Sequence, residues 1–234
     1  YNAFSGLLTD SILPTRDACI AINNELIKLP IHVFNDFPKP ADIKPSSLIH
    51  IKFGLCGDYT NLAIYAMRSV GIPVTTGSIP HWGHSNNSHA FNLLYGEDGN
   101  YYDFAGGEHH PGDHLKRFDG IPKVYQKTFS IQQTSLVMTN TSKEEIPAFF
   151  KNPFMKDITD HFPAIHPQTV SIPLNRTCHN KYAYLCVFDP QGWFPVDWGK
   201  ISDKKVTFNH IGPNIIYQVN SYENNSLQPL SSPF

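Results

Sequence analysis

The sequence of 234 residues has no apolar run that approaches the roughly 20 residues needed for a transmembrane helix. It is also poor in charge: Asp, Glu, Lys and Arg make up 16%, the formal net charge is −2, and Lys and Arg form no cluster. Because nucleic acids and anionic membranes are bound through basic clusters, we expect neither as a partner. Hydrophobic residues make up 41%, which is enough for a globular core and excludes a disordered chain.

Cysteine is scarce, and four cysteines do not make a disulfide framework. We expect Cys19 and Cys56 to be free. Cys178 and Cys186 could pair, but two buried thiols are the favoured interpretation. The chain begins and ends in the middle of a pattern, so we expect it to be a piece of a longer protein, and the absence of a leader says little about its compartment.

Cys56 is the most informative residue, because a helical pattern follows it directly. Apolar and small residues recur at helical spacing, and Gly71 and Pro73 end the pattern; the recurring positions are Thr60, Ala63, Met67 and Val70. The unpaired N–H groups and the dipole of a helix N-terminus stabilise a thiolate. The pattern therefore indicates a nucleophile, against the plainer interpretation of a small buried residue.

Three short strands are predicted after this helix, at 74–79, 89–95 and 101–104. His89 opens the second strand, Asp103 lies on the third, and a Gly- and Asn-containing turn at 96–100 joins the two. We expect His89 and Asp103 to become cross-strand neighbours. With Cys56 they would form a triad of thiolate, general base and orienting carboxylate.

These blocks resemble the transglutaminase-like superfamily, a group of papain-like cysteine enzymes. The family pattern is a Gly-x-Cys helix start, an Arg-x-x-Gly-Ile-Pro helix end, a His-Ala-aromatic strand and an Asp strand. The matching residues are Gly54-Leu55-Cys56, Arg68 with Gly71-Ile72-Pro73, His89-Ala90-Phe91 and Asp103. The resemblance covers about residues 50–105. Across its whole length the chain also resembles secreted transglutaminase-like proteins of Gram-negative gut anaerobes.

The resemblance implies a cysteine-dependent acyl-transfer enzyme that hydrolyses an amide or peptide bond through a thioester and needs no cofactor or metal. Peptides, glycopeptides and other amides are the expected substrates, and export to the periplasm or cell surface is expected. Many members of the family carry Trp after the cysteine or in the His-Ala-aromatic strand, where this chain has Gly57 and Phe91. The family pattern therefore does not identify both donors of the oxyanion hole. One is expected to be the backbone N–H of Cys56, and candidates for the second are His50, His81 and Trp82.

Outside this core, residues 15–29 predict a helix capped by Thr15, and Ser142 opens a capping-box pattern for a short helix. Beyond about residue 157, short alternating runs separated by turns predict a small antiparallel β-sandwich; they span 169–174, 181–188, 193–198, 206–211 and 215–222. We therefore predict an α+β protein. Residues 1–156 form the papain/transglutaminase-like core, in which the cysteine helix packs on an antiparallel sheet, and residues 157–234 form a β-module.

Two alternatives stay open at this point. Twelve histidines invite a metal site, but their spacing matches no zinc pattern, so no metal is expected. Trp193 and Trp198 on the predicted strands are expected to be buried, with carbohydrate stacking as the alternative. For the whole protein, the alternative to an enzyme is a catalytically silent binding or scaffold protein of the cell surface that engages glycan or protein.

Overall fold

The computed structural model describes residues 13–33 and 43–234. Contacts divide the chain into two compact units: unit 1 holds the residues up to Ser78 together with 89–118, and unit 2 holds 79–88 together with 119–234. Residues 119–156, which the composition assigned to the catalytic core, are thus grouped with the β-rich residues. The ability of residues 1–156 to fold alone stays a prediction.

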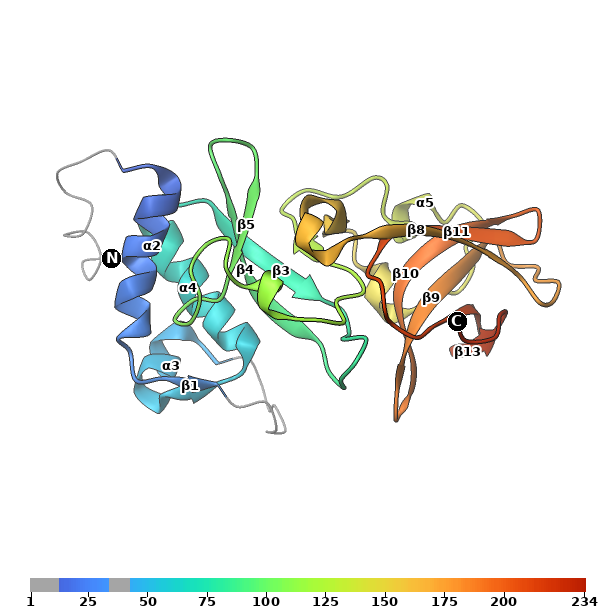
Figure 1. Ribbon diagram of the computed structural model, residues 1–234, viewed down its shortest axis with the longest axis horizontal. Helices are drawn as coiled ribbons and strands as arrows, with labels where there is room; N and C mark the ends of the chain where they lie inside the picture. Colours follow the sequence, from blue (N-terminus) through green and yellow to red (C-terminus); the bar gives the residue numbers. More distant parts are fainter. Residues whose placement is uncertain (1–12, 34–42) are drawn as a thin grey trace. The chain divides into compact units, whose positions relative to one another are not determined.

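Unit 1 contains the helices α2 (Thr15–Ile27), α3 (Pro45–Ile51) and α4 (Cys56–Ser69), with α2 and α4 in contact (Figure 1). Two short parallel strands, β1 (His32–Val33) and β2 (Phe53–Gly54), precede α3 and α4, respectively. The predicted first helix is confirmed, but its predicted cap is wrong: Thr15 lies inside the helix, and its hydroxyl donates to Glu97 Oε1 at 2.6 Å. Among the described residues, no helix is long and apolar enough to span a membrane.

The inner faces of these helices form one apolar cluster with the sheet of unit 1. The cluster includes Ala18, Ile22 and Leu26 of α2 and Ala63 and Met67 of α4, all buried. These are positions that the helical spacing predicted to share a face, as burial of an amphipathic helix requires.

The sheet of unit 1 is formed by the three predicted strands, β3 (Val74–Ile79), β4 (His89–Tyr95) and β5 (Tyr101–Phe104). They lie side by side in the order β5-β4-β3, and β4 and β5 are antiparallel. Asn92 connects β4 to α4, because its Nδ2 donates to the Thr60 carbonyl at 2.9 Å while its Oδ1 accepts the Gly106 N–H at 3.0 Å.

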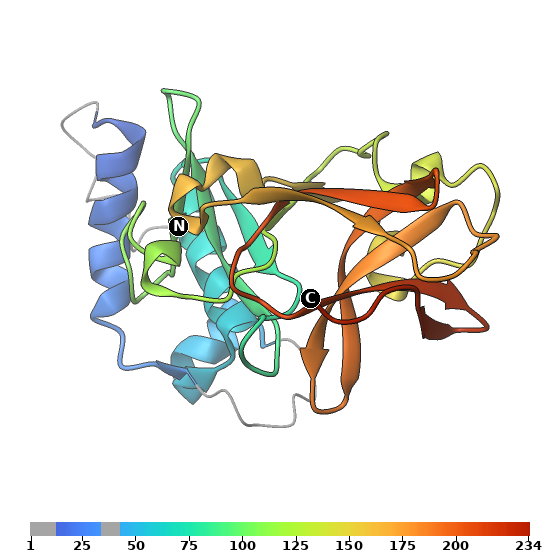
Figure 2. The same ribbon diagram turned by 45° about the vertical axis from the view of Figure 1, so that its right-hand side comes forward.

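Unit 2 contains a six-stranded antiparallel sheet in the order β13-β12-β9-β10-β11-β8, drawn from orange to dark red in Figure 2. The strands are β8 (Gln168–Pro173), β9 (Tyr182–Asp189), β10 (Gly192–Ser202), β11 (Lys205–Ile211), β12 (Tyr217–Glu223) and β13 (Ser226–Pro229). The first five match the predicted runs. The last, of four residues, was not anticipated.

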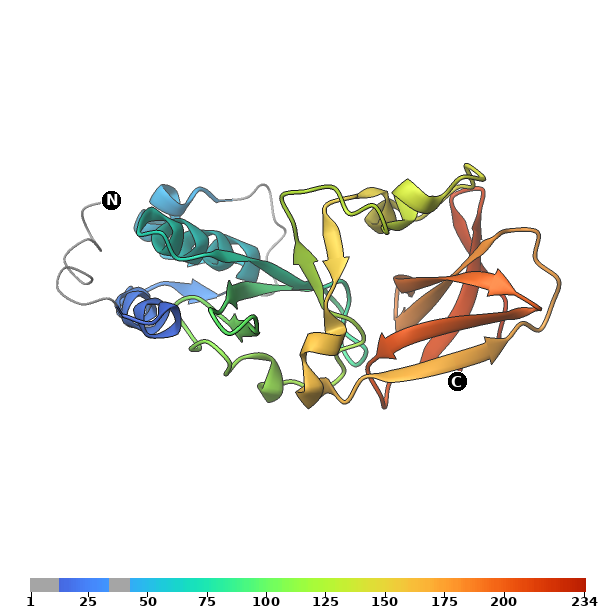
Figure 3. The same ribbon diagram turned by 90° about the horizontal axis from the view of Figure 1, so that it is seen from above.

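The sheet is sandwich-like because β10 belongs to both of its halves. Residues 192–200 of β10 pair with β9, with an irregularity between Pro195 and Asp197, whereas Ile201 and Ser202 pair with β11. A strand that passes from one half to the other in this way forms the corner of a sandwich. Figure 3 shows the strands of the two halves in ribbon form. Buried side chains of both halves form one apolar cluster, which includes Leu185, Val196, Phe208 and Val219.

Residues 119–156 cover the other face of this sheet. They contain β6 (Tyr125–Lys127), α5 (Leu136–Thr139) and η2 (Ala148–Lys151), and β6 pairs with β7 (Met155–Asp157); the short turns η3 (Thr159–His161) and η4 (Pro163–Ile165) follow. Leu136 and Phe150 pack on Tyr184 of β9. The helix predicted from the capping-box pattern at Ser142 is wrong, because the Ser142 hydroxyl instead donates to Glu144 Oε1 within a turn.

Candidate active site

Cys56 is the first residue of α4, as the sequence predicted, and its thiol is free and half-buried. The start of the helix is fixed by the buried carboxylate of Asp58, which accepts the backbone N–H groups of Leu55 and Ile43, both at 2.9 Å.

His89 is the first residue of β4, and its ring is bonded to a second histidine. The Nε2 atoms of His89 and His114 lie 2.8 Å apart, and the aromatic rings of Phe91 and Phe118 pack against His89 with centroids 6.0 Å away. Burial, and then the neighbouring His109, lower the pKa of His89 to about 4. His89 is therefore neutral at pH 7 and able to accept a proton.

His114 is a buried residue that precedes η1 (Leu115–Arg117), and it connects His89 to His109. Its second nitrogen, Nδ1, lies 2.8 Å from His109 Nδ1. Burial, and then His89, lower the pKa of His114 to about 3. Since a neutral imidazole has one N–H and one acceptor nitrogen, a donor at one end of this chain of three rings fixes the tautomer of the other two.

Asp103 does not lie opposite His89 as predicted. In the β4–β5 ladder Asp103 pairs with Leu93, four residues from His89 and about 13 Å along the strand. The Asp103 Oδ2 accepts the backbone N–H groups of His114 at 3.0 Å and Leu115 at 2.5 Å. Asp103 therefore holds the backbone of His114, whose ring contacts His89.

The two faces of β4 have different partners. Asn92 and Leu94 face α4, the former through its bond to Thr60 and the latter within the core cluster. Since side chains alternate along a strand, His89 and Phe91 share a face of β4, and His114 contacts both of their rings.

Comparison with known proteins gives one family. Residues 5–105 match the transglutaminase-like superfamily, and this stretch carries Cys56, His89 and Asp103. No curated protein matches the chain.

Two solved structures are similar to this chain at low identity. A candidate cysteine protease from Cytophaga hutchinsonii is 18% identical with a TM-score of 0.33, over 40% of this chain and 32% of its own length. LapG from Legionella pneumophila, EGTA-treated, is 14% identical with a TM-score of 0.41, over 62% of this chain and 77% of its own.

The three predicted oxyanion residues have separate environments. His50 is exposed in the last turn of α3. His81 is 5% exposed and belongs to unit 2, where its Nδ1 lies 2.7 Å from the Trp82 carbonyl and its Nε2 lies 3.1 Å from Asp189 Oδ2. Both nitrogens of His81 thus have partners within unit 2, and its role as an oxyanion donor stays a prediction. Trp82 is half-buried and belongs to unit 2, where its backbone N–H donates to the Asn87 carbonyl at 3.0 Å.

Sequence reasoning gave no role to His109 and His114, although the histidine-rich loop after Asp103 contains both. Their crowding suggested a metal site rather than a chain of hydrogen-bonded rings. Within residues 13–33 and 43–234, no group of three or more His, Cys, Asp or Glu is arranged to hold a metal ion. In the chain of rings His114 lies between the other two, so the nitrogens face one another in pairs and do not converge on one point.

Proposed function

We propose that the protein is a cysteine-dependent acyl-transfer enzyme that hydrolyses an amide or peptide bond, with Cys56 as its nucleophile. One observation carries the proposal. Cys56 has a free thiol, is the first residue of α4 and lies within the stretch that matches the transglutaminase-like superfamily. His89, which burial keeps neutral, is the proposed base, and Asp103 is the proposed acidic partner acting through the backbone of His114.

The reaction follows from the roles of these groups. The Cys56 proton passes to His89, the thiolate attacks the amide carbon, and the resulting oxyanion is stabilised by the backbone N–H of Cys56. The C–N bond then breaks, the amine leaves with the proton from His89, and a thioester remains. Water attacks this thioester and gives a proton to His89. The C–S bond then breaks, His89 returns that proton to the Cys56 sulfur, and the carboxylic acid leaves. An amine in place of water would give transamidation through the same thioester.

A peptide, glycopeptide or other amide is the substrate class that this chemistry accepts. Because the Nε2 of His89 is bonded to His114, proton exchange with the thiol has to pass through Nδ1. Activity outside the cytoplasm, in the periplasm or at the cell surface, is part of the proposal and rests on the resemblance alone.

A second candidate function is a catalytically silent binding or scaffold protein with the same fold. The observation that favours it is the register of β4 and β5, in which Asp103 pairs with Leu93 and not with His89. A protein of this kind keeps Cys56 as an ordinary thiol.

Alkylation of the thiols across pH distinguishes the two functions. Cys19 and Cys186 are internal controls, because burial raises the pKa of Cys19 to about 12 and raises that of Cys186 further, while half-buried Cys178 is the matched comparator for exposure. If Cys56 is activated, mass spectrometry will show it labelled by iodoacetamide at pH ~6 well before Cys178. Labelling of Cys56 and Cys178 at equal rates, or a His89→Phe variant with unchanged Cys56 labelling, favours the silent protein.

A further inference from the structure

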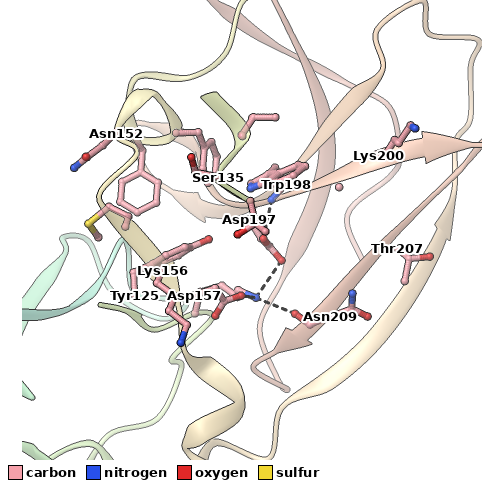
Figure 4. Close-up of a pocket in the computed structure, with 17 residues that line it drawn as sticks. Tyr125, Ser135, Asn152, Lys156, Asp157, Asp197, Trp198, Lys200, Thr207 and Asn209 are labelled. Atoms are coloured by element: carbon pink, nitrogen blue, oxygen red, sulfur yellow. Dashed lines mark hydrogen bonds and ion pairs between the residues drawn. The ribbon is translucent and has the colours of Figure 1, made fainter. Parts of the chain in front are cut away.

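A cavity of about 460 Å³ lies in unit 2, between the residues 123–157 and the strands β10 and β11 (Figure 4). This volume falls within the range of sites for small ligands. Its lining combines aromatic rings with charged and hydrogen-bonding groups, and the residues that carry the argument are Lys123, Asp157, Asp197, Trp198, Lys156 and Lys200. None of them belongs to the proposed active site.

The base of the cavity is a buried ion cluster. The Lys123 side chain is 1% exposed, and its Nζ contacts Asp157 Oδ2, Asp197 Oδ2 at 3.2 Å and the Asn209 carbonyl at 2.8 Å. Burial alone would lower the pKa of Lys123, but the two carboxylates outweigh it and raise the pKa. An ammonium group has three donors, so these contacts saturate Lys123 and leave it no donor for a ligand. Its single positive charge offsets one of the two carboxylate charges.

The two carboxylates keep acceptor capacity, because each ionised carboxylate offers about four lone-pair sites. Asp157 also accepts the Thr159 N–H and hydroxyl, Asp197 accepts the Trp198 N–H, and the Asp157 side chain is 35% exposed. The Ser135 hydroxyl lines the same cavity, and its oxygen is buried without a hydrogen-bond partner within the described residues. The oxygen atoms of this part of the cavity wall can therefore accept hydrogen bonds from a ligand.

Two further features frame the opening. The half-buried Trp198 offers an aromatic surface, held edge-on against Tyr182 with ring centroids 5.6 Å apart. Lys156 and Lys200 are exposed, form none of the ion pairs found among the described residues, and lie on opposite sides of the pocket in Figure 4. The lining carries three lysines against two aspartates, so its formal charge is +1.

These features exclude most ligand classes. An apolar ligand would strip water from Asp157 without replacing its hydrogen bonds. An ammonium ligand would compete with Lys123 and be repelled by three lysines, and a phosphate bound deep in the cavity would meet two carboxylates. A ring with many hydroxyl groups satisfies the wall, because it donates to carboxylates and packs its apolar face on an aromatic side chain.

We propose that this cavity binds a saccharide that carries carboxylate groups. The sugar ring packs on Trp198, its hydroxyls donate to Asp157 and Asp197, and its carboxylates face Lys156 and Lys200. The proposal does not depend on the reaction proposed for Cys56, since every residue it uses lies in unit 2.

Calorimetric titration of the full chain with two matched probes tests the proposal: digalacturonic acid and the neutral disaccharide of the same linkage, galactobiose. We expect saturable binding of the acidic probe with a Kd below about 10 mM, and binding at least tenfold weaker for the neutral one. The double variant Lys156→Gln and Lys200→Gln is expected to remove this preference. Added salt should weaken binding of the acidic probe alone.

Two variants locate the binding. Trp198→Ala should weaken it at least tenfold, whereas Trp193→Ala, a change outside the lining of this cavity, should leave it unchanged. If Trp198→Ala is unfolded by circular dichroism, Thr207→Trp serves instead, because Thr207 is an exposed position of the lining. The proposal is overturned if neither probe binds or if lysine methyl ester binds in their place. It is also overturned if binding persists in the folded variant tested, Trp198→Ala or Thr207→Trp.

Discussion

The Nε2 atoms of His89 and His114 lie 2.8 Å apart, so one of these two neutral rings donates a hydrogen bond to the other. In papain-like chemistry the group bonded to the far nitrogen of the catalytic imidazole sets its tautomer. The structure puts a histidine, not a carboxylate, in contact with that nitrogen. Asp103 lies one step further out, on the backbone of His114.

Replacement of His114 therefore tests whether it orients His89. His114→Phe keeps a ring between Phe91 and Phe118 but removes both nitrogens. We expect Cys56 alkylation at pH 7 to slow by about tenfold or more, with little change in the thermal midpoint. His114→Gln, which keeps polar atoms in the side chain, should recover part of the rate, and equal rates in all three proteins would contradict the prediction.

The same two histidines predict how stability depends on pH. Their pKa values are about 4 and about 3 in the folded protein, against about 6.5 when unfolded, so between these values the unfolded chain binds more protons. Stability is therefore full above pH ~6.5 and falls as the pH drops toward 4, by on the order of 2–3 kcal/mol for each histidine. Urea unfolding at pH 7 and pH 4.5 should show this loss, and the double variant His89→Phe and His114→Phe should show much less of it.

Asp103 is predicted to serve the stability of the loop that carries His114. Asp103→Ala leaves two buried backbone N–H groups without an acceptor, which costs about 2–4 kcal/mol in free energy of unfolding. Asp103→Asn keeps one acceptor oxygen and should lose less. If Asp103→Ala unfolds at the urea concentration of the wild type, the carboxylate does not hold this loop.

Gly106 marks the closest approach of the loop after β5 to α4. A Cβ built at Gly106 would lie 2.2 Å from the Ala63 Cβ, so Gly106→Ala should destabilise the protein by about 1–3 kcal/mol. Ala63→Gly removes the opposing atom, and the double variant should regain part of the stability lost in Gly106→Ala. Chemical denaturation of the four proteins measures the coupling, and purely additive effects would show that the two positions do not clash.

Residues 142–160 should resist limited proteolysis if they are packed as the structure shows. Phe150 is buried on Tyr184, and the Thr159 hydroxyl accepts the Val124 N–H at 2.9 Å. A folding boundary at 156/157, as the composition change indicates, instead predicts preferred cutting within this stretch. Mass mapping of the first fragments decides between the two.

The sequence predicted where elements lie better than how they pair. Helical spacing located α4, because burial of one face of a helix imposes a period on the sequence. Short runs separated by loop and turn residues located β3, β4 and β5. The pairing of Asp103 with Leu93 depends on the turn, in which the Gly96 N–H bonds the Asn100 carbonyl at 2.9 Å. Residue types alone did not show which turn geometry the chain would adopt, and the register followed from it.

The contacts of distant segments were the second limit. His114 contacts His89, 25 residues away in the sequence, and Lys123 contacts Asn209, 86 residues away. No periodic pattern in the sequence predicts either pair. Residues 119–156 have little regular structure, so their packing on β9 leaves no clear signal in the sequence. The compositional change near residue 157 marks where the longer strands begin, whereas the boundary between the two units lies at residues 118/119.

The segment 79–88 has a consequence for how the protein is made. It lies between β3 and β4 in the sequence, yet His81 binds Asp189 and His84 Nε2 lies 2.7 Å from the Asn214 carbonyl, partners separated from them by 108 and 130 residues. During synthesis the strands on either side of this segment leave the ribosome well before those partners exist. The two histidines stay in water until β9 and the residues after β11 arrive, so this loop is expected to be among the last parts of the nascent protein to become fixed.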